Sequence, residues 1–218
     1  MRKILLKVSV AFTLFGLLLF SCKKNVKEEK QQEVSQEVLS KIKELGFSTA
    51  QVVARDGGYV VEGDIFLSPD NLNEVSTSPV LRIAEVEQYR TRNVVTGLPR
   101  TITISLSGLS TAYVQGADLA ISRYNAENLQ IQFQRVSSGG NIRIEGFYEG
   151  PSGGFITLGS AGFPSRNGNP YSRILMNTHP QAYGSNPNVQ YVGSVIQHEI
   201  GHCIGFRHTD WMLSLIHI

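Results

Sequence analysis

The feature of this sequence that most constrains its fold is a cluster of histidines near the C-terminal end. Residues 198–210 read HEIGHCIGFRHTD, which places His198, His202 and His208 close together along the chain. On a helix, His198 and His202 are one turn apart and project from the same side, so their imidazole nitrogens can bind one metal ion. Zinc favours such ligands, and a catalytic zinc site keeps one position open for water. The pattern therefore predicts a site for Zn2+ on a helix.

Glu199 is the residue of this motif that can carry out acid–base chemistry. On a helix over residues 189–204, a rotation of ~100° per residue places Glu199 between Val195 and Val192 in an apolar arc. An unpaired carboxylate there would be costly, whereas beside a metal ion and its water it is the expected general base. The alternative is a structural zinc site with a non-catalytic glutamate, although structural sites usually have four protein ligands.

Gly205 explains how the third histidine can join the other two. If the helix continued, His208 would lie ~9 Å further along its axis than His202. A glycine can adopt a left-handed conformation, end the helix and turn the chain back. We therefore expect the helix to end near Gly205, and His208 to return toward the metal ion.

These residues resemble a known group of enzymes. Residues 198–210 resemble the metzincin zinc-binding motif, and the run from residue 45 to residue 210 is similar to the bacterial HEIGH metallopeptidases. The resemblance implies that the three histidines bind zinc and that Glu199 is the catalytic acid/base. It also implies a secreted zinc-dependent endopeptidase, which hydrolyses peptide bonds with a metal-bound water that Glu199 activates.

The resemblance also implies a peptide or protein substrate. A strand over Phe155–Leu158 would form the edge of the cleft, and an extended peptide would pair with it. A function of another class remains open, namely a lipid-anchored binding or adhesion protein with a structural or vestigial zinc site. A fourth protein ligand would favour that alternative, and a metal-bound water in a clear cleft would favour the enzyme.

The end of the chain departs from the metzincin pattern. Metzincins continue after the third histidine into a small C-terminal subdomain with a methionine turn below the metal. Here only residues 211–218 follow the motif, and Met212 comes too early to form this turn. We therefore expect a truncated domain in which the C-terminal subdomain is missing, and a weakly active or inactive chain.

The rest of the sequence predicts an α+β fold. Apolar residues from Val34 to Leu45 recur at helical spacing, and Gly46 supplies a helix stop. Strands are expected at residues 50–53, 59–61, 65–67, 101–106, 129–136, 141–147, 155–158 and 174–176, with residues 68–79 as a loop. Helices are expected at 113–129 and 189–204. The order implies a metzincin-like mixed twisted sheet with a backing helix and an active-site helix.

The predicted domain organisation has three parts. Residues 1–22 form a lipoprotein signal peptide, residues 23–91 a tether, a helix and a small propeptide-like β region, and residues 92–218 the truncated metallopeptidase domain. The first part has a positive start and an uncharged, mostly apolar stretch at 8–20, which is too short to span a membrane as a helix.

Cys22 directly follows this apolar stretch and Ser21, and the arrangement resembles a bacterial lipobox. We expect lipidation of Cys22, which would anchor the exported protein to a bacterial membrane, at the cell surface or in the periplasm. An ordinary signal peptide with an incidental cysteine is the alternative.

Asp64 is a candidate inhibitory switch. Residues 60–65 read VVEGDI and resemble the aspartate switch in the propeptide of astacins, another metzincin family, where an aspartate ligates zinc and keeps the enzyme inert. A carboxylate can take the open position of the zinc, and Gly63 lets the backbone approach closely. The alternative is a simple Gly-Asp turn between two strands.

The net charge, the second cysteine and the other two histidines give less information about function. The net charge of +2 is small and no basic run is interleaved with aromatic residues, so we expect no nucleic-acid partner. Cys203 lies in the apolar helix pattern and should be buried. His179 and His217 lack the context of a metal site.

Overall fold

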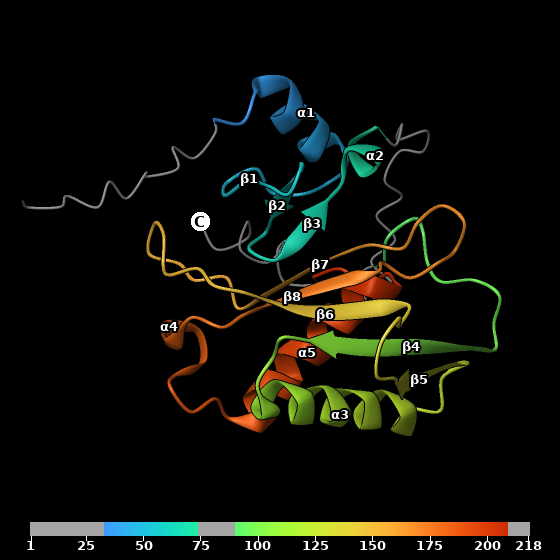
Figure 1. The fold of residues 1–218 in the computed structure, drawn as a ribbon. Helices are drawn as coiled ribbons and strands as arrows, with labels where there is room; N and C mark the ends of the chain where they lie inside the picture. The colour runs from blue at the N-terminus through green and yellow to red at the C-terminus, as the bar shows by residue number, and fades with distance from the viewer. Residues whose placement is uncertain (1–32, 74–89, 209–218) are drawn as a thin grey trace, which may run out of the picture. The chain divides into compact units, whose positions relative to one another are not determined.

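In the computed structural model, which describes residues 33–73 and 90–208, the chain forms a mixed sheet with helices packed against it (Figure 1). The order of the described strands is β1-β2-β3-β7-β8-β6-β4-β5. The fold is therefore α+β, as the sequence predicts.

The parallel part of the sheet comes from the middle of the chain. Strand β4 (Arg100–Ser107) pairs in parallel with both β5 (Ile131–Arg135) and β6 (Ile142–Phe147), and β6 pairs in parallel with β8 (Arg173–Asn177). Strand β7 (Gly159–Gly162) is antiparallel to β8. Because β4 lies between β5 and β6, these two strands are not neighbours although they follow each other along the chain.

Three N-terminal strands continue the same sheet. Strands β1 (Val53–Arg55), β2 (Gly58–Val61) and β3 (Ile65–Leu67) form an antiparallel meander, and β3 pairs in parallel with β7. The predicted propeptide-like region and the predicted metallopeptidase domain therefore share one sheet. Strand β7 takes the place of the strand predicted at 155–158, and it has a neighbour on each side. The edge at which we expected substrate to pair is therefore covered by β3.

Two long helices pack together against this sheet. Helix α3 (Thr111–Ala126) and helix α5 (Val189–Ile204) contribute buried residues to the main core, together with β4, β6 and β8. They pack closely because Gly116 of α3 lies directly against Val192 and Gly193 of α5. This packing fixes the helix that carries the histidine motif.

The shorter helices are α1 (Gln36–Glu44), α2 (Pro69–Leu72) and α4 (Pro180–Tyr183). Helix α1 covers the N-terminal strands, where a second group of buried apolar residues includes Ile42, Phe47 and Phe163. Phe163 follows β7, so this second group joins the N-terminal strands to the rest of the sheet.

Three sequence predictions were wrong in their boundaries. The first strand lies at 53–55 and not at 50–53, because the two-residue turn Asp56-Gly57 sets the register of the β1–β2 hairpin. Residues 68–79 do not begin as a loop, since Ser68 caps helix α2.

The third correction concerns the strand predicted at 155–158, which lies instead at 159–162. The Gly-Ser-Ala-Gly sequence of this strand has low strand propensity, so the sequence pattern does not indicate a strand here. These small residues are all buried and allow close approach from both sides.

No helix among the described residues has the length and apolar character needed to cross a membrane. The predicted signal peptide, the predicted lipidation site Cys22, Met212 and His217 all lie outside residues 33–73 and 90–208.

The close packing of α3 and α5 gives a stability prediction. A Cβ added at Gly116 would lie 2.9 Å from Val192 Cγ1 and 3.0 Å from the Gly193 backbone nitrogen. Alanine normally stabilises a helix by ~1 kcal/mol relative to glycine, but overpacking costs ~1–3 kcal/mol. We therefore expect Gly116→Ala to lower the free energy of unfolding by roughly 1 kcal/mol. Urea denaturation measures this, with the exposed Ser122→Ala on α3 as control. A Gly116→Ala protein more stable than its parent would contradict this packing.

Candidate metal centre

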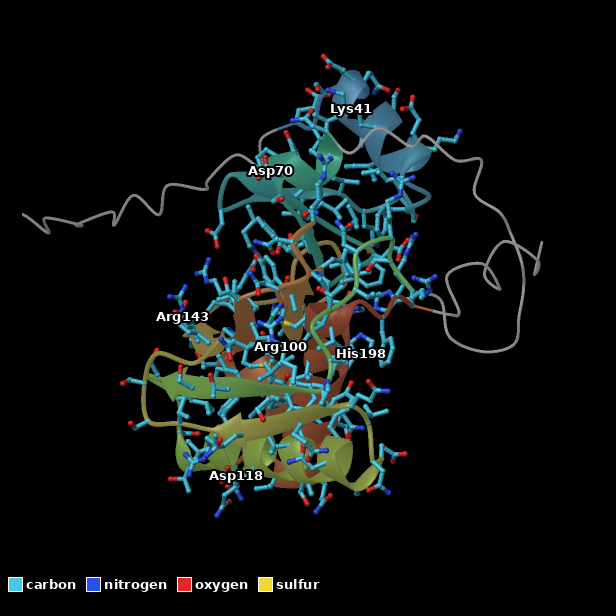
Figure 2. The ribbon with its side chains drawn as sticks, turned by 90° about the vertical axis from the view of Figure 1, so that its right-hand side faces the viewer. Lys41, Asp70, Arg100, Asp118, Arg143 and His198 are labelled. Carbon is cyan, nitrogen blue, oxygen red and sulfur yellow. The ribbon has the colours of Figure 1, made fainter. Side chains whose placement is uncertain are left out.

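Helix α5 positions the first two predicted ligands. The helix begins after Asn188, whose side chain accepts a hydrogen bond from the Tyr191 backbone N–H, and it carries His198 and His202 one turn apart. Their Nε2 atoms are 3.0 Å apart. His198 is the more exposed of the two, and Figure 2 labels it. The helical spacing therefore brings both nitrogens to one point.

His208 returns to the same point after the helix ends. Gly205 is left-handed, with φ of 115°, and its backbone N–H bonds to carbonyls of the last helical turn. The Nε2 atom of His208 lies 3.1 Å from that of His198. The turn predicted at Gly205 is thus present, and it places the third imidazole beside the other two.

The ring orientation of His202 is set by the backbone. Its Nδ1 atom lies 2.8 Å from the carbonyl oxygen of Phe206, and a carbonyl can only accept. The Nδ1–H therefore donates to Phe206, which leaves the lone pair of Nε2 directed toward the other imidazoles. This is the tautomer that binds a metal ion through Nε2.

Asp64 is the fourth member of the cluster. Its Oδ2 atom lies 3.1 Å from His198 Nε2 and 3.2 Å from His208 Nε2, and it is 3.9 Å from His202 Nε2. The four ligand atoms lie within 4.8 Å of one another. The structure therefore brings Asp64, from the turn between β2 and β3, to the three histidines of the C-terminal motif.

The geometry and chemistry of this group suit zinc. Tetrahedral ligands at ~2.0–2.1 Å from zinc are roughly 3.3 Å apart. The Nε2 atom of His198 lies 3.0 Å from that of His202 and 3.1 Å from that of His208. Three imidazoles and one carboxylate are ligands that zinc favours. The residues present therefore fit this metal.

Electrostatics favours charge separation within the group. Burial alone would raise the pKa of Asp64, but hydrogen bonds with the three histidines outweigh it and hold this pKa well below its usual range. Burial likewise would lower the pKa of His208, yet its contacts with Asp64 and Glu62 raise it to about 10. A cation among these residues is therefore strongly favoured, whether it is a proton or a metal ion.

Glu199 is buried on the same helix, one residue after the first ligand. Its side chain is almost inaccessible and its Oε2 atom has no hydrogen-bond partner. Burial, and then the negative charge of Asp64, raise the pKa of Glu199 well above its ordinary value. A buried carboxylate oxygen without a hydrogen-bond partner is costly, so this position is difficult to explain by packing alone.

Gly159 makes room for this carboxylate. A Cβ at Gly159 would lie 2.7 Å from Glu199 Oε1. A side chain at the first residue of β7 would therefore displace the Glu199 carboxylate from its position.

Two residues of this centre are not singled out by the sequence pattern, namely Gly159 and Glu62. Glu62 Oε2 lies 3.4 Å from His208 Nδ1, and its Oε1 accepts a hydrogen bond from the Ser48 backbone N–H. A lone acidic residue directly after the buried strand β2 is the signal that could have identified it. Nothing in the sequence indicates which residue it would face.

The predictions for Cys203 and His179 concern residues outside the metal centre. Cys203 is fully buried, as expected from its place on the apolar face of α5. His179 begins helix α4, where its Nδ1 accepts from the Gln181 backbone N–H, and its ring lies 4.8 Å from that of Tyr148. His179 is therefore a capping residue and not part of the cluster.

Comparison with known proteins gives one family and several solved structures. The model of a family described as dual-action HEIGH metallo-peptidase matches residues 59–217. A structure of myroilysin is 17% identical with a TM-score of 0.40, and covers 55% of this chain and 54% of that one. High choriolytic enzyme 1, a hatching enzyme zinc-protease from the medaka fish Oryzias latipes, is 19% identical with a TM-score of 0.29, covering 50% of this chain and 44% of that one. The chain thus spans about half the length of these structures. No curated protein sequence matches significantly.

Proposed function

Because the chain belongs to the family of dual-action HEIGH metallo-peptidases, we propose that it is a zinc-dependent endopeptidase, with Asp64 holding the described state inactive. The observation that carries this proposal is the convergence of three histidine Nε2 atoms on one point, beside the buried carboxylate of Glu199. In this proposal His198, His202 and His208 hold the zinc ion.

Zinc bound at such a site lowers the pKa of a water molecule and polarises a peptide carbonyl. Glu199 could accept a proton from that water, because it follows a proposed metal ligand directly and has a carboxylate oxygen without a hydrogen-bond partner. The same carboxyl group can then return the proton to the leaving amine nitrogen.

Asp64 and strand β3 together obstruct this chemistry in the described state. Asp64 Oδ2 lies where a fourth ligand would bind the metal, and β3 pairs with β7 along the strand that an extended substrate would use. The backbone N–H of Ala161 in β7 donates to the carbonyl of Asp64 itself, at 3.1 Å. The residue that blocks the metal is therefore also fixed to the substrate-binding strand, which supports the role of a latch.

A second candidate function is a binding or adhesion protein with a structural zinc site. One observation favours it, since Asp64 supplies the fourth protein ligand that closed structural sites have. The buried Glu199 argues against it, because a purely structural site has no use for an additional carboxylate at such a cost. The two functions predict different effects of replacing Asp64: a gain of hydrolysis for the endopeptidase, and a loss of zinc for the structural site.

We also propose that the protein is exported and anchored to a bacterial membrane through lipid on Cys22, with a peptide or protein as substrate and no nucleic acid as partner. The support is the sequence of residues 1–22 and the small net charge.

The latch predicts that Asp64→Asn increases hydrolysis. Asparagine is a much weaker zinc ligand than aspartate, so water and substrate gain access to the metal. Cleavage of an unfolded protein such as casein by the zinc-loaded full chain should rise by at least tenfold. The matched control is Asp56→Asn, which removes a charge from the neighbouring turn, where Asp56 forms only an exposed ion pair with Arg173. Loss of zinc from the Asp64→Asn chain, with no gain in cleavage, would favour the structural site.

Glu199→Gln, made in the Asp64→Asn chain, should retain zinc and lose hydrolysis. Glutamine has nearly the same shape but cannot take up the proton of the water, and general-base catalysis is worth about 10²–10⁴-fold. Zinc content is measured by metal analysis and cleavage by release of labelled peptides. The exposed Glu127→Gln serves as control. Undiminished cleavage by the Glu199→Gln protein would refute this role.

A further inference from the structure

The second carboxylate of the β2–β3 turn, that of Glu62, faces the outer nitrogen of a metal ligand. Glu62 Oε2 lies 3.4 Å from His208 Nδ1, whereas the Nε2 atom of the same ring faces Asp64 and His198. The Glu62 side chain is only 4% exposed, so its charge is not screened by water. Its Oε1 atom accepts a hydrogen bond from the Ser48 backbone N–H, whereas its buried Oε2 atom has no established hydrogen-bond partner.

Arg207, the residue before His208, contacts Gly46 and Phe47, which precede the Ser48 that binds Glu62. Arg207 Nη2 donates to the carbonyl of Gly46 at 2.8 Å, and its guanidinium lies over the ring of Phe47 at 3.8 Å. The negative charge of Glu62 offsets part of the effect of burial, which lowers the pKa of Arg207. Residues 207 and 208 follow the end of helix α5, so the helix does not fix their positions. The contacts of Arg207 and Glu62 therefore help to position the imidazole of His208.

Glu62 also has an unusual backbone. Its φ of 53° lies in the left-handed region, which glutamate rarely adopts. Conformations of this kind persist where surrounding contacts hold them, and they concentrate at functional sites. Here the contacts are those that the side chain makes with Ser48 and His208.

We infer that Glu62 is a positioning residue of the metal centre: it accepts a hydrogen bond from the Nδ1–H of His208 and so fixes the third ligand in the tautomer that binds zinc through Nε2. The carbonyl of Phe206 does the same for His202. A carboxylate behind a metal-bound histidine orients the ring and strengthens it as a ligand. The N-terminal hairpin therefore completes the metal centre from outside, while Asp64, two residues further on, enters it.

This inference rests on the proposed zinc site, and it gives the two carboxylates opposite roles. Asp64 takes a position that catalysis needs, whereas Glu62 strengthens a ligand that catalysis also needs. A chain that lost the whole hairpin would lose the latch and the support of His208 together. Release of Asp64 alone would leave the support in place.

Glu62→Gln tests the inference through zinc affinity and needs no measurement of hydrolysis. The glutamine can still accept from Ser48 with its oxygen, but its NH2 group then faces His208 Nδ1. That arrangement favours the ring tautomer with its proton on Nε2, which cannot bind zinc through Nε2. Competition with a chromogenic chelator should show an affinity about 10–100-fold lower than that of the parent chain. The control Glu37→Gln removes an exposed carboxylate from α1 in the same N-terminal region, and should leave the affinity unchanged.

The same pair of measurements in the Asp64→Asn background separates a direct role from an indirect one. If Glu62 acts on His208, Glu62→Gln weakens zinc binding by the same factor whether or not Asp64 is present. If Glu62 merely holds the hairpin that carries Asp64, the effect vanishes when Asp64 is replaced, and the inference is overturned. Melting in the presence of EDTA reports the stability of the metal-free fold. Should Glu62→Gln fail to fold, Glu62→Asp replaces it and should give a smaller loss of affinity.

Unchanged zinc affinity in the Glu62 variants would refute the inference and leave the proposed function intact. A parent chain that binds no zinc would refute the proposed function, and the inference with it.

Discussion

The structure depends on the burial of two polar side chains, Glu199 and His202, on a helix whose neighbours are apolar. Helix α5 must pack against both the sheet and helix α3, and it does so with Val192, Ile196 and other apolar residues. An imidazole and a carboxylate inside this interface would be destabilising without compensation. His202 obtains it from the Phe206 carbonyl and from the neighbouring imidazoles. The Oε2 atom of Glu199 has no hydrogen-bond partner, and for this reason we assign Glu199 the role of general base in the proposed function.

The N-terminal strands supply negative charge beside three clustered imidazoles, which a bound proton or metal ion would make positive. Strand β3 extends the sheet beside β7, and the turn before it carries Glu62 and Asp64 to opposite sides of the His208 ring. One short hairpin therefore neutralises the cluster, covers the strand expected to bind substrate and supports the third ligand. The three effects depend on the pairing of β3 with β7, because the register of these two strands fixes the position of the β2–β3 turn that carries Glu62 and Asp64.

Much of this arrangement follows from local sequence, and the rest depends on contacts that no local pattern records. The helix over residues 189–204, its end at Gly205 and the burial of Glu199 follow from periodicity and from the properties of glycine. Strand β7 was misplaced because glycine and serine give little strand signal, although small residues are what its close neighbours Glu199 and β3 require. The nearness of Asp64 to the histidines was expected only from a resemblance. Glu62 was missed because its partner lies far away along the chain, and side-chain spacing on one strand cannot reveal such a partner.

In the proposed latched state, three imidazoles and the Asp64 carboxylate surround one zinc ion. X-ray absorption spectroscopy at the zinc edge measures this directly in the zinc-loaded chain, since it reports ligand type and distance without crystals. The account predicts nitrogen and oxygen ligands at ~2.0–2.1 Å, with the outer-shell scattering of three imidazoles, and it predicts that Asp64→Asn changes only the oxygen contribution. A sulfur ligand at ~2.3 Å, or the scattering of fewer than three imidazoles, would contradict it.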